Sequence, residues 1–200
     1  MHSKIDEYKA CLIITFIAFS LTCILIYWYL LDPQQFVNKR LGFSNHLLDF
    51  WAWIFTLLIA LIYVLYTIMA VSFVKKHIWK CSILKVLGLW IAITSSITEE
   101  IVFRQLVIEK LYELEYTTWI QIIISGIIFG IAHGLWGLLG KEIKVIFPII
   151  LTTTILGILL AMLYIYTNNN IFYPIVSHTL INFFIEPWLL LAVISKRWHI

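Results

Sequence analysis

Residues 83–111 read ILKVLGLWIAITSSITEEIVFRQLVIEKL, an apolar stretch long enough to cross a bilayer as a helix. Near its centre stand two adjacent glutamates, Glu99 and Glu100, and Arg104 follows one turn later. An ionised side chain at the centre of a membrane costs about 3 kcal/mol even on lenient insertion scales. Charged residues at that depth mark a functional site, so this stretch predicts a membrane helix that carries one.

The composition of the whole chain indicates the same class. Of the 200 residues, 62% are hydrophobic and 12% are charged, whereas an ordinary soluble domain is about half apolar and about a quarter charged. The net charge of +3 is small and no basic stripe suited to nucleic acid occurs, so we expect the lipid bilayer, and no nucleic acid, as a partner. The three cysteines have no CxxC spacing, which argues against a disulfide framework or a zinc knuckle.

Apolar segments of spanning length recur along the chain and predict an all-α fold. We expect a polytopic transmembrane helix bundle of about six spanning helices around a buried polar site. The expected spans are 8–31, 47–74, 83–111, 117–139, 145–166 and 171–194, joined by linkers at 32–46, 75–82, 112–116, 140–144 and 167–170. The second and third spans exceed the length that a bilayer requires, so they must tilt, bend or protrude.

Basic residues set the expected orientation of the bundle. Ten lysine and arginine residues fall on the side that carries both termini, and three fall on the opposite side. Because cytoplasmic loops are enriched in basic residues, we expect a multi-pass protein of the cell membrane with both termini in the cytoplasm. In a straight-helix map, however, His133 falls toward the cytoplasmic end of its span and His178 toward the outer end of its own. A shared site with Glu99 then requires tilt, a shifted helix boundary or a topology that differs from the one expected here.

The spacing of the charged residues in the third span predicts different roles for the two glutamates. Glu100 and Arg104 are spaced i, i+4, so they share a helix face and can pair, which leaves neither charge alone in low dielectric. Glu99 is turned about 100° away. We infer a structural Glu100–Arg104 ion pair and a Glu99 that is free to act on substrate or water. The alternative is that all three only neutralise one another as a packing element.

The fourth span carries a histidine beside a stripe of small residues. Gly126, Gly130 and Gly134 form a small-xxx-small pattern, which lets a neighbouring helix approach closely. Phe129 is four residues before His133 and shares its face, so its ring can wall off one side of the imidazole. Taken alone, His133 is more often a hydrogen-bonded core residue than a catalyst.

The sixth span presents an imidazole and an amide on one face, because His178 and Asn182 are again spaced i, i+4. An asparagine can orient a histidine or donate to a developing oxyanion. For these two residues taken alone, however, an interhelical hydrogen-bonded pair is the simpler interpretation. Pro187 removes a backbone hydrogen bond and is expected to kink this helix. Glu186, just before it, ranks below the others as a further polar participant.

Together these residues predict a hydrolytic centre. A carboxylate can take a proton from water, histidines can position that water or bind a metal, and an amide can hold an oxyanion. The chain has no HExxH, GxSxG or phosphate-loop motif that would favour another chemistry. The four candidate catalytic residues are Glu99, His133, His178 and Asn182.

Three motifs, in this order and each within an apolar span, carry a resemblance to a known family: Glu99-Glu100-x-x-x-Arg104, Phe129-x-x-x-His133 and His178-x-x-x-Asn182. The pattern resembles the CAAX protease and bacteriocin-processing family, also called the Abi family, whose members are intramembrane endopeptidases. The resemblance covers roughly residues 83–194, which would form the protease core after an N-terminal transmembrane hairpin at 1–82 and before a short cytoplasmic tail at 195–200. One departure is Gln105, since the family arginine is often followed by glycine.

The resemblance implies a role for each residue. Glu99 and His133 would activate the attacking water, and His178 with Asn182 would stabilise the oxyanion. Three residues would shape the site: Glu100, Arg104 and Phe129. Its implied substrate is a peptide or a membrane-associated protein.

The sequence leaves the cofactor and two other functions open. Family members have been described both as glutamate-type proteases and as metalloproteases, and Glu99, His133 and His178 could hold Zn²⁺ with one open position for water. We expect a metal-free mechanism and leave open whether a cofactor is bound. A non-catalytic role in bacteriocin immunity or as a scaffold, and a small proton-coupled transporter, are the alternatives, because buried glutamate and histidine can also relay protons.

Overall fold

The structure is a computed structural model that describes residues 4–43, 47–139 and 143–197, without the side chains of 136–145. Over these ranges all of its regular secondary structure is helical and no strand is present. The elements are α1 (Lys4–Leu31), α2 (Pro33–Gln35), a π-helical segment η1 (Phe36–Arg40), α3 (Phe50–Ala70), α4 (Ser72–His77), α5 (Ile83–Glu100), a second π-helical segment η2 (Ile101–Leu106), α6 (Val107–Glu113), α7 (Thr118–Leu139), α8 (Ile143–Tyr166), α9 (Phe172–Ile185) and α10 (Trp188–Ile194). The predicted all-α fold is therefore confirmed.

The described helices include five that are long and apolar enough to cross a membrane. One of them is the continuous run of α5, η2 and α6, from Ile83 to Glu113. The pair α9 and α10 passes the same test only when taken together, because it bends by 51° at its break. The chain is a multi-pass membrane protein with five spans, or six when the bent pair counts as one.

Local sequence signals explain where several helices begin and end. The carboxylate of Asp49 caps α3 by accepting from the backbone N–H groups of Trp51 and Ala52 at 2.9 and 3.1 Å. Val71 is extended and ends α3 at Ala70, so the predicted second span is shorter than expected and α4 continues in another direction. The kink predicted at Pro187 is confirmed, since α9 stops two residues before it.

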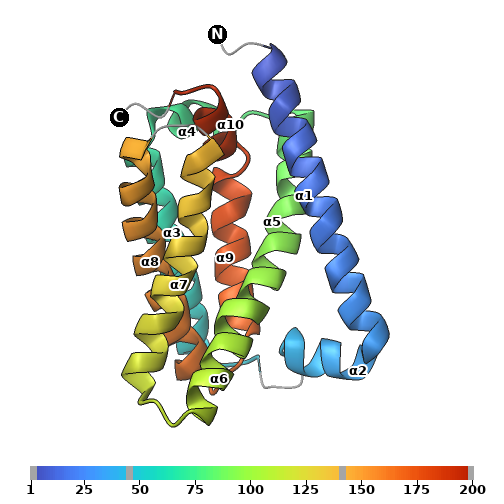
Figure 1. Ribbon diagram of the computed structural model, residues 1–200, viewed down its shortest axis with the longest axis vertical. Coiled ribbons are helices and arrows are strands. Elements are labelled where there is room, and N and C mark those ends of the chain that lie inside the picture. The colour runs from blue at the N-terminus through green and yellow to red at the C-terminus, as the bar shows by residue number, and fades with distance from the viewer. Residues whose placement is uncertain (1–3, 44–46, 140–142, 198–200) are drawn as a thin grey trace.

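The helices form a bundle in which α7 and α8 pair closely (Figure 1). A methyl group added to Gly157 of α8 would lie 2.9 Å from the Cα atom of Gly126, so the two backbones touch. Gly130 and Gly134 also face α8, which confirms that the small-residue stripe admits a neighbouring helix. The close pairing holds α7, and with it His133, against the rest of the bundle.

The two N-terminal spans lie on different parts of the bundle. Helix α1 packs along α5, whereas α3 packs against α9 and α8 (Figure 1). The division into an N-terminal hairpin at 1–82 and a core that begins at residue 83 stays a prediction. The cytoplasmic tail at 195–200 also stays a prediction, and its residues 198–200 lie outside the described ranges. The linker predicted at 140–144 also lies partly outside them, and the one at 32–46 contains α2 and η1.

Candidate functional site

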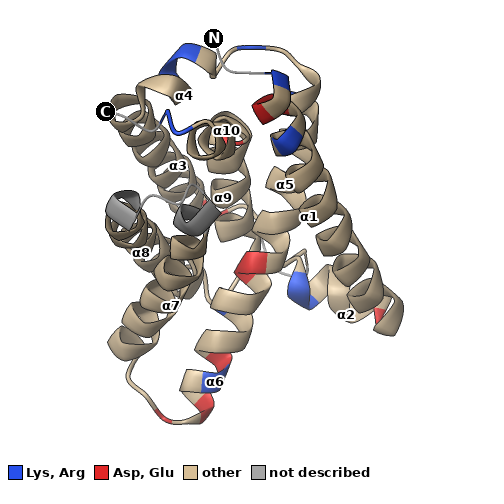
Figure 2. Ribbon diagram, turned by 45° about the horizontal axis from the view of Figure 1, so that its top comes forward, with Lys and Arg blue, Asp and Glu red and all other residues tan. Residues whose placement is uncertain are grey.

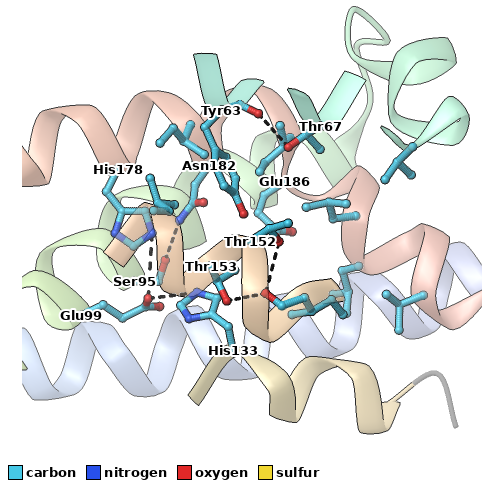
Figure 3. Close-up of a pocket in the computed structure, with 18 of the residues that line it drawn as sticks. Tyr63, Thr67, Ser95, Glu99, His133, Thr152, Thr153, His178, Asn182 and Glu186 are labelled. Atoms are coloured by element: carbon cyan, nitrogen blue, oxygen red, sulfur yellow. Dashed lines mark hydrogen bonds and ion pairs between the residues drawn. The ribbon is translucent and has the colours of Figure 1, made fainter. Parts of the chain in front are cut away.

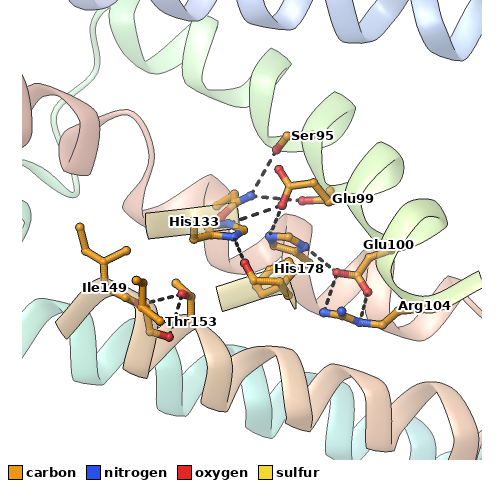
Figure 4. Close-up of polar contacts among 12 residues, drawn as sticks. Ser95, Glu99, Glu100, Arg104, His133, Ile149, Thr153 and His178 are labelled. Carbon is orange, nitrogen blue, oxygen red and sulfur yellow. Dashed lines mark hydrogen bonds and ion pairs between the residues drawn. The ribbon is translucent and has the colours of Figure 1, made fainter. Parts of the chain in front are cut away.

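Side chains from three helices converge on one carboxylate oxygen. Glu99 projects from α5, His133 from α7 and His178 from α9 (Figure 4). The Nε2 atom of His133 lies 3.5 Å from Glu99 Oε2, and the Nε2 atom of His178 lies 3.9 Å from the same oxygen. Glu99 and His133 keep 25% and 20% of their side-chain surfaces exposed, so both remain accessible to a bound molecule. The structure thus brings three predicted site residues into one cluster.

In a map of straight helices, His178 and Glu99 fall at different depths in the membrane. The break between α9 and α10 changes the position of His178 along its helix. Because α9 covers only Phe172–Ile185, His178 stands at its middle and not near the end of a long span. Glu99 lies near the middle of the run from Ile83 to Glu113. The shifted helix boundary therefore lets His178 and Glu99 meet at one level.

In both histidines the Nδ1 atom lies within hydrogen-bonding distance of an oxygen atom. His133 Nδ1 lies 3.0 Å from the backbone carbonyl of Phe129, which can only accept, so Nδ1–H donates to it. His178 Nδ1 lies 2.8 Å from Oε1 of Glu100 and donates to that carboxylate. In each neutral ring the lone pair is then on Nε2, the atom that faces Glu99. The contact between His178 and Glu100 was not expected from the sequence, because nothing in the local spacing links the two residues.

The predicted ion pair between Glu100 and Arg104 is present. Arg104 Nε lies 2.9 Å from Glu100 Oε2, and neither side chain is exposed. Arg104 also donates to Ser125 Oγ at 3.3 Å, and Ser125 in turn donates to the backbone carbonyl of Phe103 at 2.7 Å. Ser125 was missed by the sequence reasoning, because a serine in an apolar helix gives no signal of its partner. The buried pair cannot touch a substrate, but it orients His178 through Glu100.

The ring of Phe129 lies at the centre of this arrangement. Its centroid is 4.2 Å from that of His133 and 5.5 Å from that of His178. The Arg104 guanidinium carbon lies 4.7 Å from the centroid of the same ring, within the range of a cation–π contact. The ring of Phe129 therefore lies against the His133 imidazole, as expected, and also contacts the buried arginine.

The amide of Asn182 faces two serines of α5. Asn182 Nδ2 lies 3.4 Å from the Oγ atoms of both Ser95 and Ser96, which are long contacts for a hydrogen bond. The sequence reasoning missed both serines, although Ser95 is four residues before Glu99 and shares its face. Asn182 and Ser95 therefore lie beside the cluster of Glu99 and the two histidines.

A cavity of about 300 Å³ opens onto these groups (Figure 3). Four of its lining residues are the predicted catalytic set of Glu99, His133, His178 and Asn182. Most of the remaining wall is apolar and comes from several helices, including Ile17, Leu21, Tyr66, Ala70, Ile91, Leu156, Ile181, Leu189 and Val193. Such a space fits an apolar segment whose polar backbone reaches the carboxylate.

The donor atoms of the cluster suit a metal ion as well as a water molecule. One ligand atom from each of Glu99, His133 and His178 lies within 4.8 Å of the other two. Glu99 Oε2 is buried without a hydrogen-bond partner, and both histidines have Nδ1–H groups held by oxygens, as metal-ligating histidines commonly do. These residues fit a Zn²⁺ site with an open position.

The fold and the site define a class of protein, namely a multi-pass membrane protein with a polar Glu–His–His centre open to an apolar cavity. The family model described as "Type II CAAX prenyl endopeptidase Rce1-like" matches residues 81–184, just over half of the chain. The chain therefore belongs to the Rce1-like family, which confirms the resemblance, and the matched segment contains all the predicted site residues. Searches of curated proteins and of solved structures gave no significant match.

Proposed function

We propose that this chain is an intramembrane endopeptidase that hydrolyses peptide bonds of a peptide or a membrane-associated protein. The observation that carries the proposal is Glu99 Oε2, which lies 3.5 Å from His133 Nε2 on the wall of the cavity. A water molecule between these two atoms would be within reach of two proton acceptors. Family membership supports the reaction class, since the matched family is named for an endopeptidase.

In the first step, Glu99 takes a proton from water while His133 Nε2 holds the same molecule. The oxygen of the water adds to the carbonyl carbon of the scissile bond, and the carbonyl oxygen becomes an oxyanion. In the second step, the carbon–nitrogen bond breaks and the proton held by Glu99 passes to the leaving amine. The products are an amine and a carboxylic acid, which loses its proton to the solvent, and Glu99 returns to its starting state.

The oxyanion requires hydrogen-bond donors, and we assign these to His178 and Asn182. His178 can donate through Nε2 only as an imidazolium, because Nδ1–H already donates to Glu100 at 2.8 Å. Asn182 can turn its amide from the long contacts with Ser95 and Ser96 toward the developing charge.

A zinc ion, if one is bound, would be held by Glu99, His133 and His178, and it would supply a Lewis acid. The roles of Phe129 and of the Glu100–Arg104 pair, which hold the two histidines in position, are the same with or without it.

The test is cleavage of a proteome-derived peptide library by the purified protein in detergent, read by mass spectrometry. We expect new peptide termini with the wild type and a rate lower by about 10²–10⁴-fold with Glu99→Gln, which keeps the shape but takes no proton. Glu113→Gln is the matched control, because Glu113 is an exposed carboxylate at the end of α6. Cleavage by Glu99→Gln at the wild-type rate would show that Glu99 is not the base, and no cleavage by the wild type would favour a non-catalytic role or a transporter.

A further inference from the structure

The cavity contains a second carboxylate that the proposed chemistry does not use. Glu186 lies at the break between α9 and α10, and its backbone N–H donates to the Asn182 carbonyl at 2.8 Å. Its side chain lines the same cavity as Glu99 and stands near Asn182 and Thr152 in the close-up (Figure 3). A group that binds substrate beside the reacting bond would occupy such a position.

Lys85 lies close to Glu186, but its ammonium group contacts backbone carbonyls of the α9 end. Lys85 Nζ donates to the backbone carbonyl of Phe183 and lies 3.4 Å and 3.5 Å from those of Phe184 and Glu186. It also lies 4.7 Å from the centroid of the Phe183 ring. Lys85 therefore caps the end of α9, where free carbonyls attract cations, and within the described part of the chain the Glu186 carboxylate is in no ion pair.

Among the described side chains that line the cavity, the acidic ones have no lysine or arginine beside them. The described lining includes the carboxylates of Glu99 and Glu186 and the rings of two histidines, but no lysine or arginine. Around Glu186 the wall is largely apolar, with Ile185, Leu189 and Leu190 as neighbours in the chain. An isolated charge in apolar surroundings is costly unless a partner of opposite sign joins it. A ligand with a cationic group and an apolar body would provide that partner.

We propose that Glu186 forms a subsite for a lysine or arginine side chain of the substrate, next to an apolar segment that fills the rest of the cavity. This inference rests on the proposed protease function and adds a substrate class to it. The break that holds Glu186 lies on the side of the catalytic cluster toward α10, and α10 stands at the end of the bundle with α4 and both termini (Figure 1). A segment that enters from that end therefore meets Glu186 on its way to Glu99.

The test measures the binding of fluorescent peptides to the detergent-purified protein, separately from cleavage. The peptides share one apolar sequence, and a single lysine is moved along it, with methionine at the same positions as the uncharged match. We expect the best lysine peptide to bind at least about 10-fold more tightly than its methionine match. In Glu186→Gln this ratio should fall to about one, while the affinity for the methionine peptide should stay unchanged; Glu113→Gln should keep the wild-type ratio.

Each outcome decides the subsite independently of the proposed reaction. A ratio near one in the wild type at every lysine position would overturn the subsite, whether or not the peptides are cut. Equal losses for lysine and methionine peptides in Glu186→Gln would assign Glu186 a structural role. A clear lysine preference without cleavage would keep the subsite and reject the protease function.

Discussion

Glu100 is the residue that joins the structural and chemical parts of the site. Arg104 contacts both of its oxygens, with Nε 2.9 Å from Oε2 and Nη2 3.4 Å from Oε1, and Oε1 also accepts from His178 on α9. A fully buried carboxylate with two such partners has its charge compensated on both sides. The position of His178, and so the direction of its Nε2 atom, depends on this carboxylate.

Removal of Arg104 should destabilise the folded protein as well as lower activity. Arg104→Ala leaves the Glu100 charge buried with only His178 beside it, and breaking a buried pair in this way costs about 3–5 kcal/mol. Thermal unfolding in detergent, followed by loss of monodisperse protein on gel filtration, measures the effect.

The double variant Glu100→Gln with Arg104→Gln is the control for that prediction. Because it removes both charges, it should recover part of the lost stability. Equal instability of the single and double variants would contradict the energetic importance of the pair.

His178 distinguishes the metal-free mechanism from the zinc mechanism. As an oxyanion donor it needs a hydrogen on Nε2, whereas as a metal ligand it needs a lone pair there. In the metal-free mechanism we expect His178→Gln, whose amide can donate, to be at least about 10-fold more active than His178→Ala. Activity should also survive dialysis against a zinc chelator. Loss of activity on chelation, recovery with Zn²⁺ and equal inactivity of the two variants would establish the metal site instead.

The close packing of α7 on α8 determines how precisely His133 is placed. The contact depends on glycine at the crossing point, where any side chain would meet backbone atoms of the other helix. A Cβ atom on Gly126 would lie 2.9 Å from the backbone nitrogen of Ile158 and 3.1 Å from the carbonyl oxygen of Thr154. Neither atom can move without shifting α8, which lines the cavity through Thr152 and Thr153.

Gly126→Ala should therefore lower stability by about 1–3 kcal/mol, as overpacking does in a tight interior, and reduce peptide cleavage with it. The unfolding midpoint and the cleavage rate are the two measurements. Ile127→Leu is the control, because Ile127 is 42% exposed on the same helix and should change neither. Wild-type stability in Gly126→Ala would show that the helices can separate at no cost.

The bundle as a whole has an asymmetric charge distribution. Basic positions gather at the end that holds α4 and the two termini, whereas on α6, at the other end, one basic position lies between acidic ones (Figure 2). The proposed route of a substrate starts at the end that holds α4 and the two termini, so the orientation of the bundle decides from which side of the membrane the substrate enters. The excess of basic residues at the terminal end predicts that this end is cytoplasmic.

Labelling of single cysteines in intact cells tests this orientation. In a background with the three natural cysteines replaced by serine, an impermeant maleimide should label Glu113→Cys directly. It should label Lys76→Cys, on α4, only after the cells are lysed. The opposite pattern would place both termini outside the cytoplasm.

Much of the fold follows from local properties of the sequence. The length of each apolar run determines a spanning helix, since backbone groups in lipid must be satisfied within the segment. Spacing on one helix is equally local, so the Glu100–Arg104 pair and the contact of Phe129 with His133 could be predicted. The kink at Pro187 follows from the missing N–H group of proline.

The tertiary structure decided which of these local features meet. The contact of His178 with Glu100, the placement of Ser95 and Ser125, and the isolation of Glu186 in the cavity each depend on how helices far apart in the sequence cross. Periodicity identifies the face of a helix but not the helix that covers it, because helix packing depends on the summed shapes of many side chains. The sequence determined which residues could form the site, and only the packing of α5, α7 and α9 brought Glu99, His133 and His178 together.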